Sequence, residues 1–477
     1  MKREFTIGVA WSGAASWLEQ GASVIVFLLI ARLVGAEAFG VATMAFAFLF
    51  LGEFLVRDTI TEAIVERRSL EDGRLEATFF ALIGFSLAIV LVLCIISGFA
   101  ATLYGEPDVA PLIIASSPTV LMIGAAGVST ALLRRELAYK TLAIRTILGV
   151  VAGGIMGISL ALNDFGAWSL VGQRLTQAGI NSAFAIKAAG WLPQRWARGT
   201  DFSLLKGLGP RVVALRSLAL IIVQTPTVAL GIFAGPTAVG MFAFAWRMTE
   251  IVLFLIVNPL KGVAQSALAE MRRQNQSTAE FYLDLTELAA LCCFSAFAGL
   301  ALLSEPLIRV LVGPDWHDAG TILPFLCIAG AISALSAVQE AYLLAIDRLA
   351  AFVSASLIEV AIGVVIVVLT SPFGPAAVGA AVALRILLIL PLRTNAALKP
   401  ELIPWAQFMH ALISPILVAA CVSLIVGLWR ITAADGVTDV ILIATSVVLG
   451  IATFCILLFG FMPKTAGRIR TFVSARH

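Results

Sequence analysis

The sequence predicts an all-α integral membrane protein of about 14 transmembrane helices, arranged as two six-helix lobes with two extra C-terminal helices. Hydrophobic residues make up 60% of its 477 residues, charged residues only 13%, and the mean hydropathy is +1.01. Soluble domains contain roughly 45–50% apolar and about 25% charged residues, so a soluble core could not bury this much apolar surface. Two further observations, recurring apolar runs and an internal repeat, define the arrangement.

The apolar runs are long enough to cross a bilayer, which takes about 20 residues in a helix. The polar breaks between them define these expected spans: 7–34, 39–65, 77–103, 111–133, 141–162, 167–190, 207–234, 238–263, 284–312, 320–346, 350–370, 376–398, 404–430 and 439–462. The first run is too long for the apolar region of a typical signal peptide, so we expect it to be a retained helix.

Basic residues in the short breaks predict the orientation, because loops rich in Lys and Arg stay in the cytoplasm. Alternate breaks carry basic residues, among them Lys2, Arg67, Arg134, Arg272 and Arg348. The other set of breaks contains no Lys or Arg: 35–38, 104–110, 163–166, 235–237, 313–319, 371–375 and 431–438. We therefore expect a multi-pass protein of the cell (inner) membrane with both termini in the cytoplasm.

The first and second halves of the chain echo one another. The segments 35–40 (GAEAFG) and 235–240 (GPTAVG) share Gly, Ala and Gly at equal spacing. Weaker echoes pair 165–166 with 373–374 and 105–108 with 313–315. Because each copy would hold six spans, both enter the membrane from one side and are related by an axis along the membrane normal. The predicted domains are a lobe at 1–200, a lobe at 201–400, and spans 13 and 14 with a basic cytoplasmic tail at 401–477.

Several function classes are disfavoured by the residues themselves. All six cysteines lie in apolar runs without CxxC spacing, which indicates packing and no metal site. The net charge of +3 gives no reason to expect a nucleic-acid partner. The sequence has no P-loop and no cluster with catalytic spacing, so we expect a non-enzyme without cofactors. Gly149, Gly153 and Gly157 have the spacing of a helix-packing seam.

Five segments resemble the polysaccharide-exporter (Wzx-type flippase) branch of the multidrug/oligosaccharidyl-lipid/polysaccharide exporter superfamily. They are 29–35 (LIARLVG), 131–137 (ALLRREL), 165–171 (FGAWSLV), 240–248 (GMFAFAWRM) and 311–316 (LVGPDW). The resemblance covers roughly residues 8–400. The superfamily's basic plan has twelve spans, and fourteen are found in the similar lipid II flippases.

The resemblance implies a transporter that flips an undecaprenyl-pyrophosphate-linked oligosaccharide, an exopolysaccharide or O-antigen repeat unit, by alternating access. Its implied partners are the lipid-linked oligosaccharide, membrane lipids and the polysaccharide polymerase machinery. Two alternatives stay open: an ion-coupled multidrug or small-molecule antiporter of the same superfamily, and a membrane glycan polymerase or ligase. A polymerase would need a sizeable outer-face region, whereas no outer loop exceeds about ten residues.

Ionisable side chains inside spans are the candidate substrate-binding groups, because each costs about 2.5–3.5 kcal/mol in hydrocarbon on insertion scales. In the resembled superfamily spans 1, 2, 7 and 8 line the cavity between the lobes. The candidates are Glu19, Glu53, Arg216, Gln224, Trp246, Arg247 and Arg385.

Arg247 is the first candidate for the pyrophosphate, since Arg offers paired donors to phosphate oxygens. Trp246 is expected to stack on a sugar ring, with a packed core indole as the alternative. Glu250, three residues after Arg247, allows a structural ion pair instead. Arg216 is expected to face Glu19 across the lobes.

Overall fold

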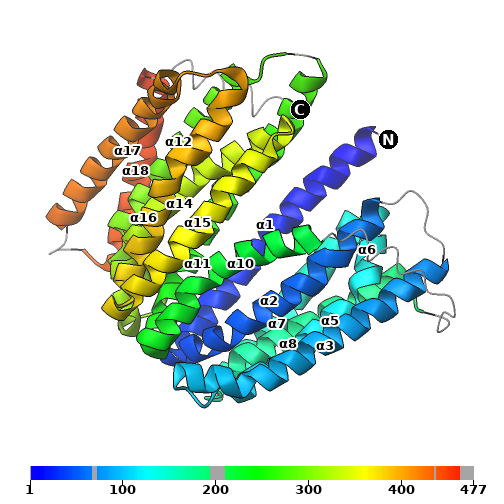
Figure 1. The fold of residues 1–477 in the computed structure, drawn as a ribbon. Coiled ribbons are helices and arrows are strands. Elements are labelled where there is room, and N and C mark those ends of the chain that lie inside the picture. Colours follow the sequence, from blue (N-terminus) through cyan, green and yellow to red (C-terminus); the bar gives the residue numbers. More distant parts are fainter. Residues whose placement is uncertain (1, 67–71, 194–209, 275, 434–436, 462–477) are drawn as a thin grey trace. The chain divides into compact units, whose positions relative to one another are not determined.

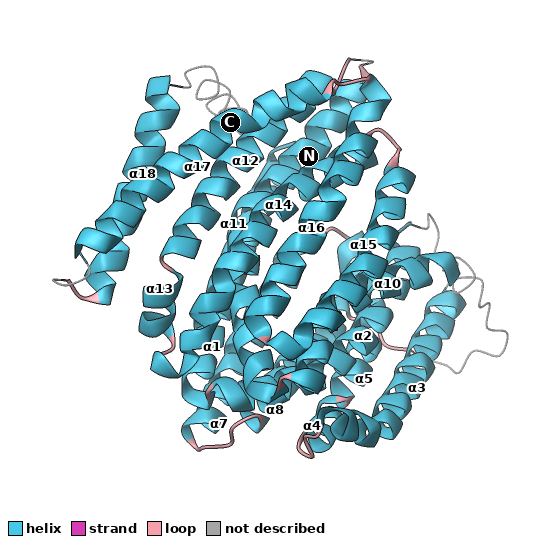
Figure 2. Ribbon diagram, turned by 60° about the vertical axis from the view of Figure 1, so that its left-hand side comes forward, coloured by secondary structure: helices cyan, strands magenta, loops and turns pink. Residues whose placement is uncertain are grey.

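The computed structural model describes residues 2–66, 72–193, 210–274, 276–433 and 437–461. Within these ranges all regular structure is helical, as Figure 2 shows. The prediction of an all-α membrane protein is confirmed. Contacts between Cα atoms divide the chain into two compact units, Met1–Gly240 and Met241–His477. The lobe boundaries at residues 200 and 400 stay a prediction, and the basic tail lies outside the described residues.

Eleven helices of the described part are long and apolar enough to cross a membrane, and a twelfth span results if one bent pair is counted as a single span. Helix α8 (Trp168–Ala189) is not among them, because Gln173, Arg174, Gln177 and Asn181 make it too polar. Helix α10 (Pro210–Phe233) contributes only the apolar part Ile221–Phe233 among the described residues. Fourteen spans would require both helices, so that number stays a prediction.

The helices of the first unit follow the expected spans closely (Figure 1). They are α1 (Lys2–Val34), α2 (Ala36–Glu66), α3 (Asp72–Tyr104), α4 (Val109–Ser116), α5 (Pro118–Ala125), α6 (Gly127–Arg135), α7 (Tyr139–Leu162), α8 and α10. The expected span 111–133 is broken into α4, α5 and α6, with a 42° bend before α6. Pro118 begins α5 without an N–H to continue the hydrogen bonding of α4, which explains the first break.

Turn glycines explain the internal echoes of the sequence. Gly35 and Gly235 have almost the same positive φ, +81° and +82°, and each starts the turn into the next helix. The echoed pair Gly166 and Gly374 also have positive φ, +51° and +93°. Residues with a Cβ rarely adopt this conformation. The corresponding turns of the two halves therefore both contain glycine at these positions.

The two echoed segments also cross each other, because the start of helix α11 (Gly235–Arg273) packs on the start of α2 within the first unit. A Cβ on Gly40 would lie 1.8 Å from the carbonyl oxygen of Pro236, and a Cβ on Gly240 would lie 2.0 Å from that of Ala36. The contact is reciprocal at an offset of 200 residues. Only glycine allows the two backbones to approach this closely.

The predicted glycine seam lies between α7 and α8. A Cβ on Gly149 would lie 2.3 Å from Asn181 Oδ1, and a Cβ on Gly153 would lie 2.8 Å from the carbonyl oxygen of Gln173. A Cβ on Gly157 would lie 2.9 Å from the Cβ of Gln173. The seam brings the amide-bearing face of α8 against α7, and this close packing positions polar side chains for the site described below.

The second unit contains the rest of α11 and the helices α12 (Ala279–Leu302), α13 (Ser304–Leu311), α14 (His317–Ala345), α15 (Leu349–Thr370), α16 (Pro375–Leu398), α17 (Trp405–Ala433) and α18 (Asp439–Phe461). Its core holds Tyr282 of α12 stacked on Tyr342 of α14, with ring centroids 4.5 Å apart, and the buried Phe408 of α17. The helices beyond the expected repeat are thus packed into this unit, where Figure 1 shows α17 and α18 beside α12.

Candidate functional site

A polar cavity of about 500 Å³ lies among the helices of the first unit. We call it the arginine basin. Its lining comes mainly from α1, α2, α6, α7 and α8. The polar and charged lining residues are Glu19, Glu53, Arg57, Thr130, Arg134, Arg145, Thr146, Arg174, Gln177, Asn181 and Ser182. Such a concentration of arginine is unusual in a membrane-spanning unit, where ionised groups require partners or water.

Glu53 and Arg174, which both line the basin, are joined by two hydrogen bonds. Arg174 of α8 donates from Nε and Nη2 to the two carboxylate oxygens of Glu53 on α2, at 3.0 and 2.7 Å. Thr119 adds a third hydrogen bond to the same carboxylate at 2.8 Å. The guanidinium also lies over the ring of Phe46, 4.7 Å from its centroid. Glu53 is 7% exposed, so this pair is a fixed part of the wall.

Arg145 of α7 is less completely bound. Its Nη1 donates to the hydroxyl of Thr130 at 3.0 Å, while its buried Nε has no hydrogen-bond partner in the described part of the chain. The buried Oδ1 of Asn181, which lines the same cavity, likewise has no partner there. Buried polar atoms are nearly always satisfied, so these two mark positions where a polar ligand would gain hydrogen bonds.

The basin carries a surplus of positive charge. Four arginines (Arg57, Arg134, Arg145 and Arg174) face two carboxylates (Glu19 and Glu53), which gives 4 − 2 = +2. Arginine stays protonated even when buried, so the four positive charges persist across the physiological pH range. A group with two negative charges and several acceptor oxygens, such as a diphosphate, is the complement of this arrangement.

The structure brings together two of the predicted site residues, Glu19 and Glu53, and adds arginines that the sequence reasoning missed. Arg174 lies within the expected span 167–190, and Arg134 belongs to a break that the sequence predicts to be cytoplasmic. Arg145 lies inside the span 141–162, and its position within an apolar run was the signal that could have revealed it. The roles of these arginines follow from their contacts with side chains of other helices, which the sequence alone does not show.

Trp246 and Arg247 on α11 both bind Glu250 on the same helix. Trp246 Nε1 donates to Glu250 Oε1 at 2.9 Å, and Arg247 Nη1 donates to Oε2 at 3.1 Å. Trp246 also stacks on Phe242, with ring centroids 6.3 Å apart. The local ion pair considered as an alternative is therefore present. A role for these side chains in substrate binding stays a prediction.

Two of the remaining candidates, Gln224 and Arg385, are not among the residues that line the basin. The side chain of Arg216 lies outside the described residues, so its expected pairing with Glu19 stays a prediction. Gln224 on α10 is half-buried. Arg385 of α16 is buried beside Glu359 of α15, 3.4 Å from its carboxylate, in the second unit. The roles of these residues toward substrate also stay predictions.

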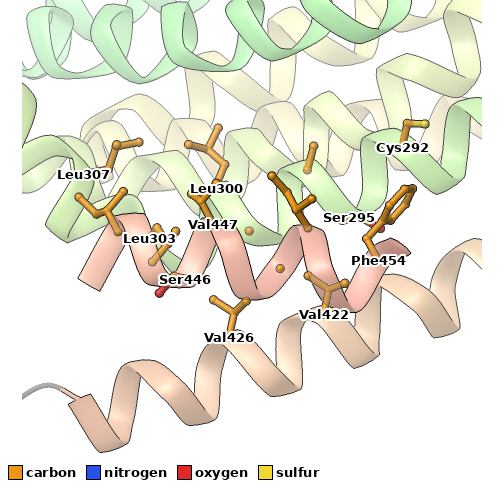
Figure 3. A pocket seen from close by; sticks show the side chains of 15 residues that line it. Cys292, Ser295, Leu300, Leu303, Leu307, Val422, Val426, Ser446, Val447 and Phe454 are labelled. Carbon is orange, nitrogen blue, oxygen red and sulfur yellow. The ribbon is translucent and has the colours of Figure 1, made fainter. Parts of the chain in front are cut away.

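A groove of about 420 Å³ lies in the second unit (Figure 3). We call it the apolar groove. Its lining includes Leu300, Leu303, Val422, Val426, Val447, Gly450 and Phe454, from α12, α17, α18 and the residue that follows α12. Two ion pairs lie near one end of these helices: Arg430 with Glu305 at 2.7 Å, and Arg309 with Asp439 at 3.3 Å. An aliphatic chain suits such a lining because burial of each methylene contributes about 0.8 kcal/mol.

Other kinds of site are not evident in the described residues. Cys292 lines the apolar groove, and none of the six cysteines forms a disulfide. No group of three or more metal-ligating side chains lies together among the described residues.

Comparison with known proteins relates this geometry to a family. A family model described as "Polysaccharide biosynthesis protein" matches residues 29–321, more than half of the chain. The chain belongs to this family. The sequence resemblance to polysaccharide exporters is confirmed, and the matched residues include all of the basin lining except Glu19 of α1.

Curated relatives agree with the family. The succinoglycan biosynthesis transport protein ExoT of Rhizobium meliloti is 24% identical over 338 residues, which cover 69% of this chain and 66% of ExoT. The lipopolysaccharide biosynthesis protein WzxC of Escherichia coli is 22% identical over 336 residues, covering 69% of this chain and 67% of WzxC. The matched region thus spans about two thirds of each relative's length.

Two solved structures of transporters share this fold. The lipid II flippase MurJ, in an inward closed conformation, matches with a TM-score of 0.79 at 15% identity, covering 95% of this chain and 99% of that chain. An inward-facing MATE family multidrug transporter matches with a TM-score of 0.60 at 16% identity, covering 84% of this chain and 95% of that one. At these identities the likeness shows the fold alone.

Proposed function

We propose that this protein flips an undecaprenyl-pyrophosphate-linked oligosaccharide, an exopolysaccharide or O-antigen repeat unit, across the cytoplasmic membrane by alternating access. The observation that carries the proposal is the +2 surplus of the arginine basin in a membrane-spanning unit. A diphosphate linkage supplies the opposite charge, and arginine side chains offer donors that match its oxygens. The family and the transporter-like relatives support a polysaccharide precursor as the cargo.

The orientation of the chain supports loading from the cytoplasm. Arg57 and Arg134 lie toward the ends of α2 and α6, and Arg145 lies near the start of α7. The sequence predicts that the breaks next to these helix ends are cytoplasmic. Both termini are inside in this topology, and the protein is a multi-pass protein of the inner membrane. A lipid-linked precursor that moves from the cytoplasmic to the outer leaflet loads on that side, where we propose that the basin takes its anionic linkage. The polymerase that joins repeat units is the expected downstream partner.

The antiporter alternative is less consistent with the basin. A multidrug antiporter for cationic drugs needs carboxylates that are available to the drug or to the coupling ion. Glu53 is already bound by Arg174 and Thr119. With Glu53 engaged, Glu19 is the remaining carboxylate of the lining, among four arginines. An anionic cargo is therefore favoured.

The test removes one basin charge in cells that depend on this protein for glycan export. We expect Arg145→Gln to lower the export rate about tenfold or more, because a hydrogen bond to a charged group contributes roughly 1.5–3 kcal/mol. Lipid-linked intermediates should accumulate on the inner leaflet. Arg145→Lys separates the two contributions, since it keeps the charge without the guanidinium geometry.

The matched control is Arg273→Gln on α11, whose ion pair with Glu270 is exposed. Membrane levels of all variants are compared by immunoblot. If Arg145→Gln exports glycan normally at normal membrane levels, the basin is not the anion site. If deletion of the whole gene causes no accumulation of lipid-linked intermediates, the flippase proposal itself is wrong.

A further inference from the structure

Two turns between helices carry a leucine in the left-handed region of backbone conformation. Leu137 follows α6 with a φ of +55°, and Leu402 precedes α17 with a φ of +56°. In both turns the N–H of the next residue donates to a carbonyl oxygen five residues back. These bonds run from Ala138 N to Leu133 O and from Ile403 N to Leu398 O, each over 3.0 Å. This pattern is the Schellman ending of a helix, in which glycine usually occupies the left-handed position.

The same kind of turn has an aspartate at two other places. Asp164 and Asp347 have φ values of +61° and +60°, and with the two leucines they are the non-glycine residues of positive φ in the described ranges. Aspartate enters this conformation more readily because its short polar side chain can hydrogen-bond locally. Leucine has no such compensation, and a bulky residue with positive φ is strained. The strain at Leu137 and Leu402 is therefore expected to be offset by something outside the turn.

The described part of the protein does not bury either leucine side chain. Leu137 is 61% exposed and Leu402 is 87% exposed. Packing against neighbouring helices thus supplies little of the required stabilisation. A leucine that faced water at these positions would combine backbone strain with the cost of hydrating an apolar side chain.

Candidate membrane spans border both turns closely. One span ends at Arg135 and the next begins at Tyr139, while Leu402 lies between a span that ends at Glu401 and one that begins at Trp405. Tyr139 and Trp405 are partly exposed, at 46% and 41%. Both residue types favour the boundary between membrane and water. The apolar surrounding within reach of each leucine is therefore the edge of the hydrocarbon layer.

We propose that these two turns are seated in the bilayer interface, with the side chains of Leu137 and Leu402 inserted among phospholipid acyl chains. Moving a leucine side chain out of water gains a free energy of the same order as the strain of its left-handed backbone, so insertion offsets the strain. Each leucine thereby fixes the depth at which its two flanking helices lie. The turn at Asp347 has a polar side chain in the same conformation and remains in water.

The seating of the first turn has a consequence for the arginine basin. Arg134 lies three residues before Leu137, is exposed and lines the basin. A turn held at the interface keeps this guanidinium at the level of the lipid phosphates, since a long arginine side chain extends toward the headgroups. Under the proposed function, an anionic linkage would meet Arg134 within the headgroup layer. The seating itself does not rest on that function.

The experiment compares single cysteines in the full-length protein, in membrane vesicles opened so that both faces are reachable. A membrane-impermeant maleimide, read out as a gel shift, should label Asp347→Cys readily. It should label Leu137→Cys and Leu402→Cys at least about tenfold more slowly, because a thiol in an apolar layer ionises less readily. Asp347→Cys is the matched control, since Asp347 is exposed in a turn of the same conformation.

The native cysteines and the folding of the variants are controlled separately. All six native cysteines lie in apolar runs, so the unsubstituted protein sets the background. Labelling in SDS gives the full extent of reaction of each variant. A second maleimide that partitions into the bilayer should label both leucine variants above the native background, which separates cover by lipid from cover by protein.

The outcomes decide the proposal without any measurement of glycan export. Labelling of the leucine variants by the impermeant reagent as fast as Asp347→Cys overturns it, because the turns are then in water. Protection from both reagents overturns it as well, because protein then covers the leucines. Equal protection of Asp347→Cys would also contradict it, since the leucine side chain would then not set the depth of the turn.

Discussion

At the residue scale, several charged side chains of the described residues are paired with partners on distant helices. Glu53 and Arg174 are 121 residues apart, and Glu305 and Arg430 are 125 apart. Partners so far apart leave no pattern in one sequence. Two pairs are local instead, Arg247–Glu250 and Arg273–Glu270, and the spacing of three residues allowed the first as an alternative to substrate binding. The position of these charges within apolar spans could be predicted from the sequence, whereas the identity of each partner could not.

Glu401 is another such long-range partner, because its carboxylate caps the beginning of α12. It accepts hydrogen bonds from the backbone N–H groups of Thr278 and Ala279, at 3.1 and 3.0 Å, and from the hydroxyls of Ser277 and Thr278. The first N–H groups of a helix have no partner within the helix, and an anion there is also favoured by the helix dipole. The cap attaches the 3-10 turn Lys399–Glu401 to α12.

We expect Glu401→Ala to lower the free energy of unfolding by about 1–2 kcal/mol, because several N–H and hydroxyl donors lose their acceptor. Glu401→Gln keeps one acceptor oxygen and should lose about half as much. Thermal unfolding in detergent measures both. The control Glu270→Ala removes an exposed carboxylate and should change stability by less than about 0.5 kcal/mol. Equal losses in Glu401→Ala and Glu270→Ala would contradict the capping role.

At the element scale, apolar length and glycine spacing were the informative signals. Long apolar runs correctly predicted most helices, because the bilayer requires a fixed length of helix. The break of the fourth span at Pro118 and the polar face of α8 were less visible, since each depends on a few residues within an otherwise apolar run. The spacing of Gly149, Gly153 and Gly157 did predict the packing seam that brings α8 to the arginine basin.

The seam gives a prediction about this pair of helices. Gly153→Leu should separate α7 from α8, because even a Cβ there would lie 2.8 Å from a backbone carbonyl of α8. We expect a loss of at least about 2 kcal/mol in stability and a lower level in the membrane. Gly98→Leu on α3 is the control, since a Cβ there meets nothing within 4 Å. Wild-type stability of Gly153→Leu would show that the seam tolerates separation.

At the scale of the whole molecule, each unit offers one of the two chemistries that a lipid-linked glycan requires. The first unit has the arginine basin for an anionic linkage, and the second has the apolar groove for a hydrocarbon chain. The internal echo predicted two related halves, because recurring turns need glycine at the same positions. It could not predict this difference, since the basin and the groove are formed by residues outside the echoed segments.

The apolar groove can be tested by filling it. Gly450 lines the groove, where an added Cβ would lie 3.6 Å from Val426, so Gly450→Leu places a large side chain in the groove with little backbone strain. If the polyprenyl chain of the cargo occupies the groove, displacing two of its methylenes costs about 1.6 kcal/mol, and glycan export should fall about tenfold. Val448→Leu is the matched control on the same helix, because Val448 is 68% exposed and does not line the groove. Export rates are compared at equal membrane levels of the two variants. Equal export rates of Gly450→Leu and Val448→Leu would mean that the polyprenyl chain of the proposed cargo does not occupy the groove. The Arg145 variants would then still test whether the basin binds the anionic linkage.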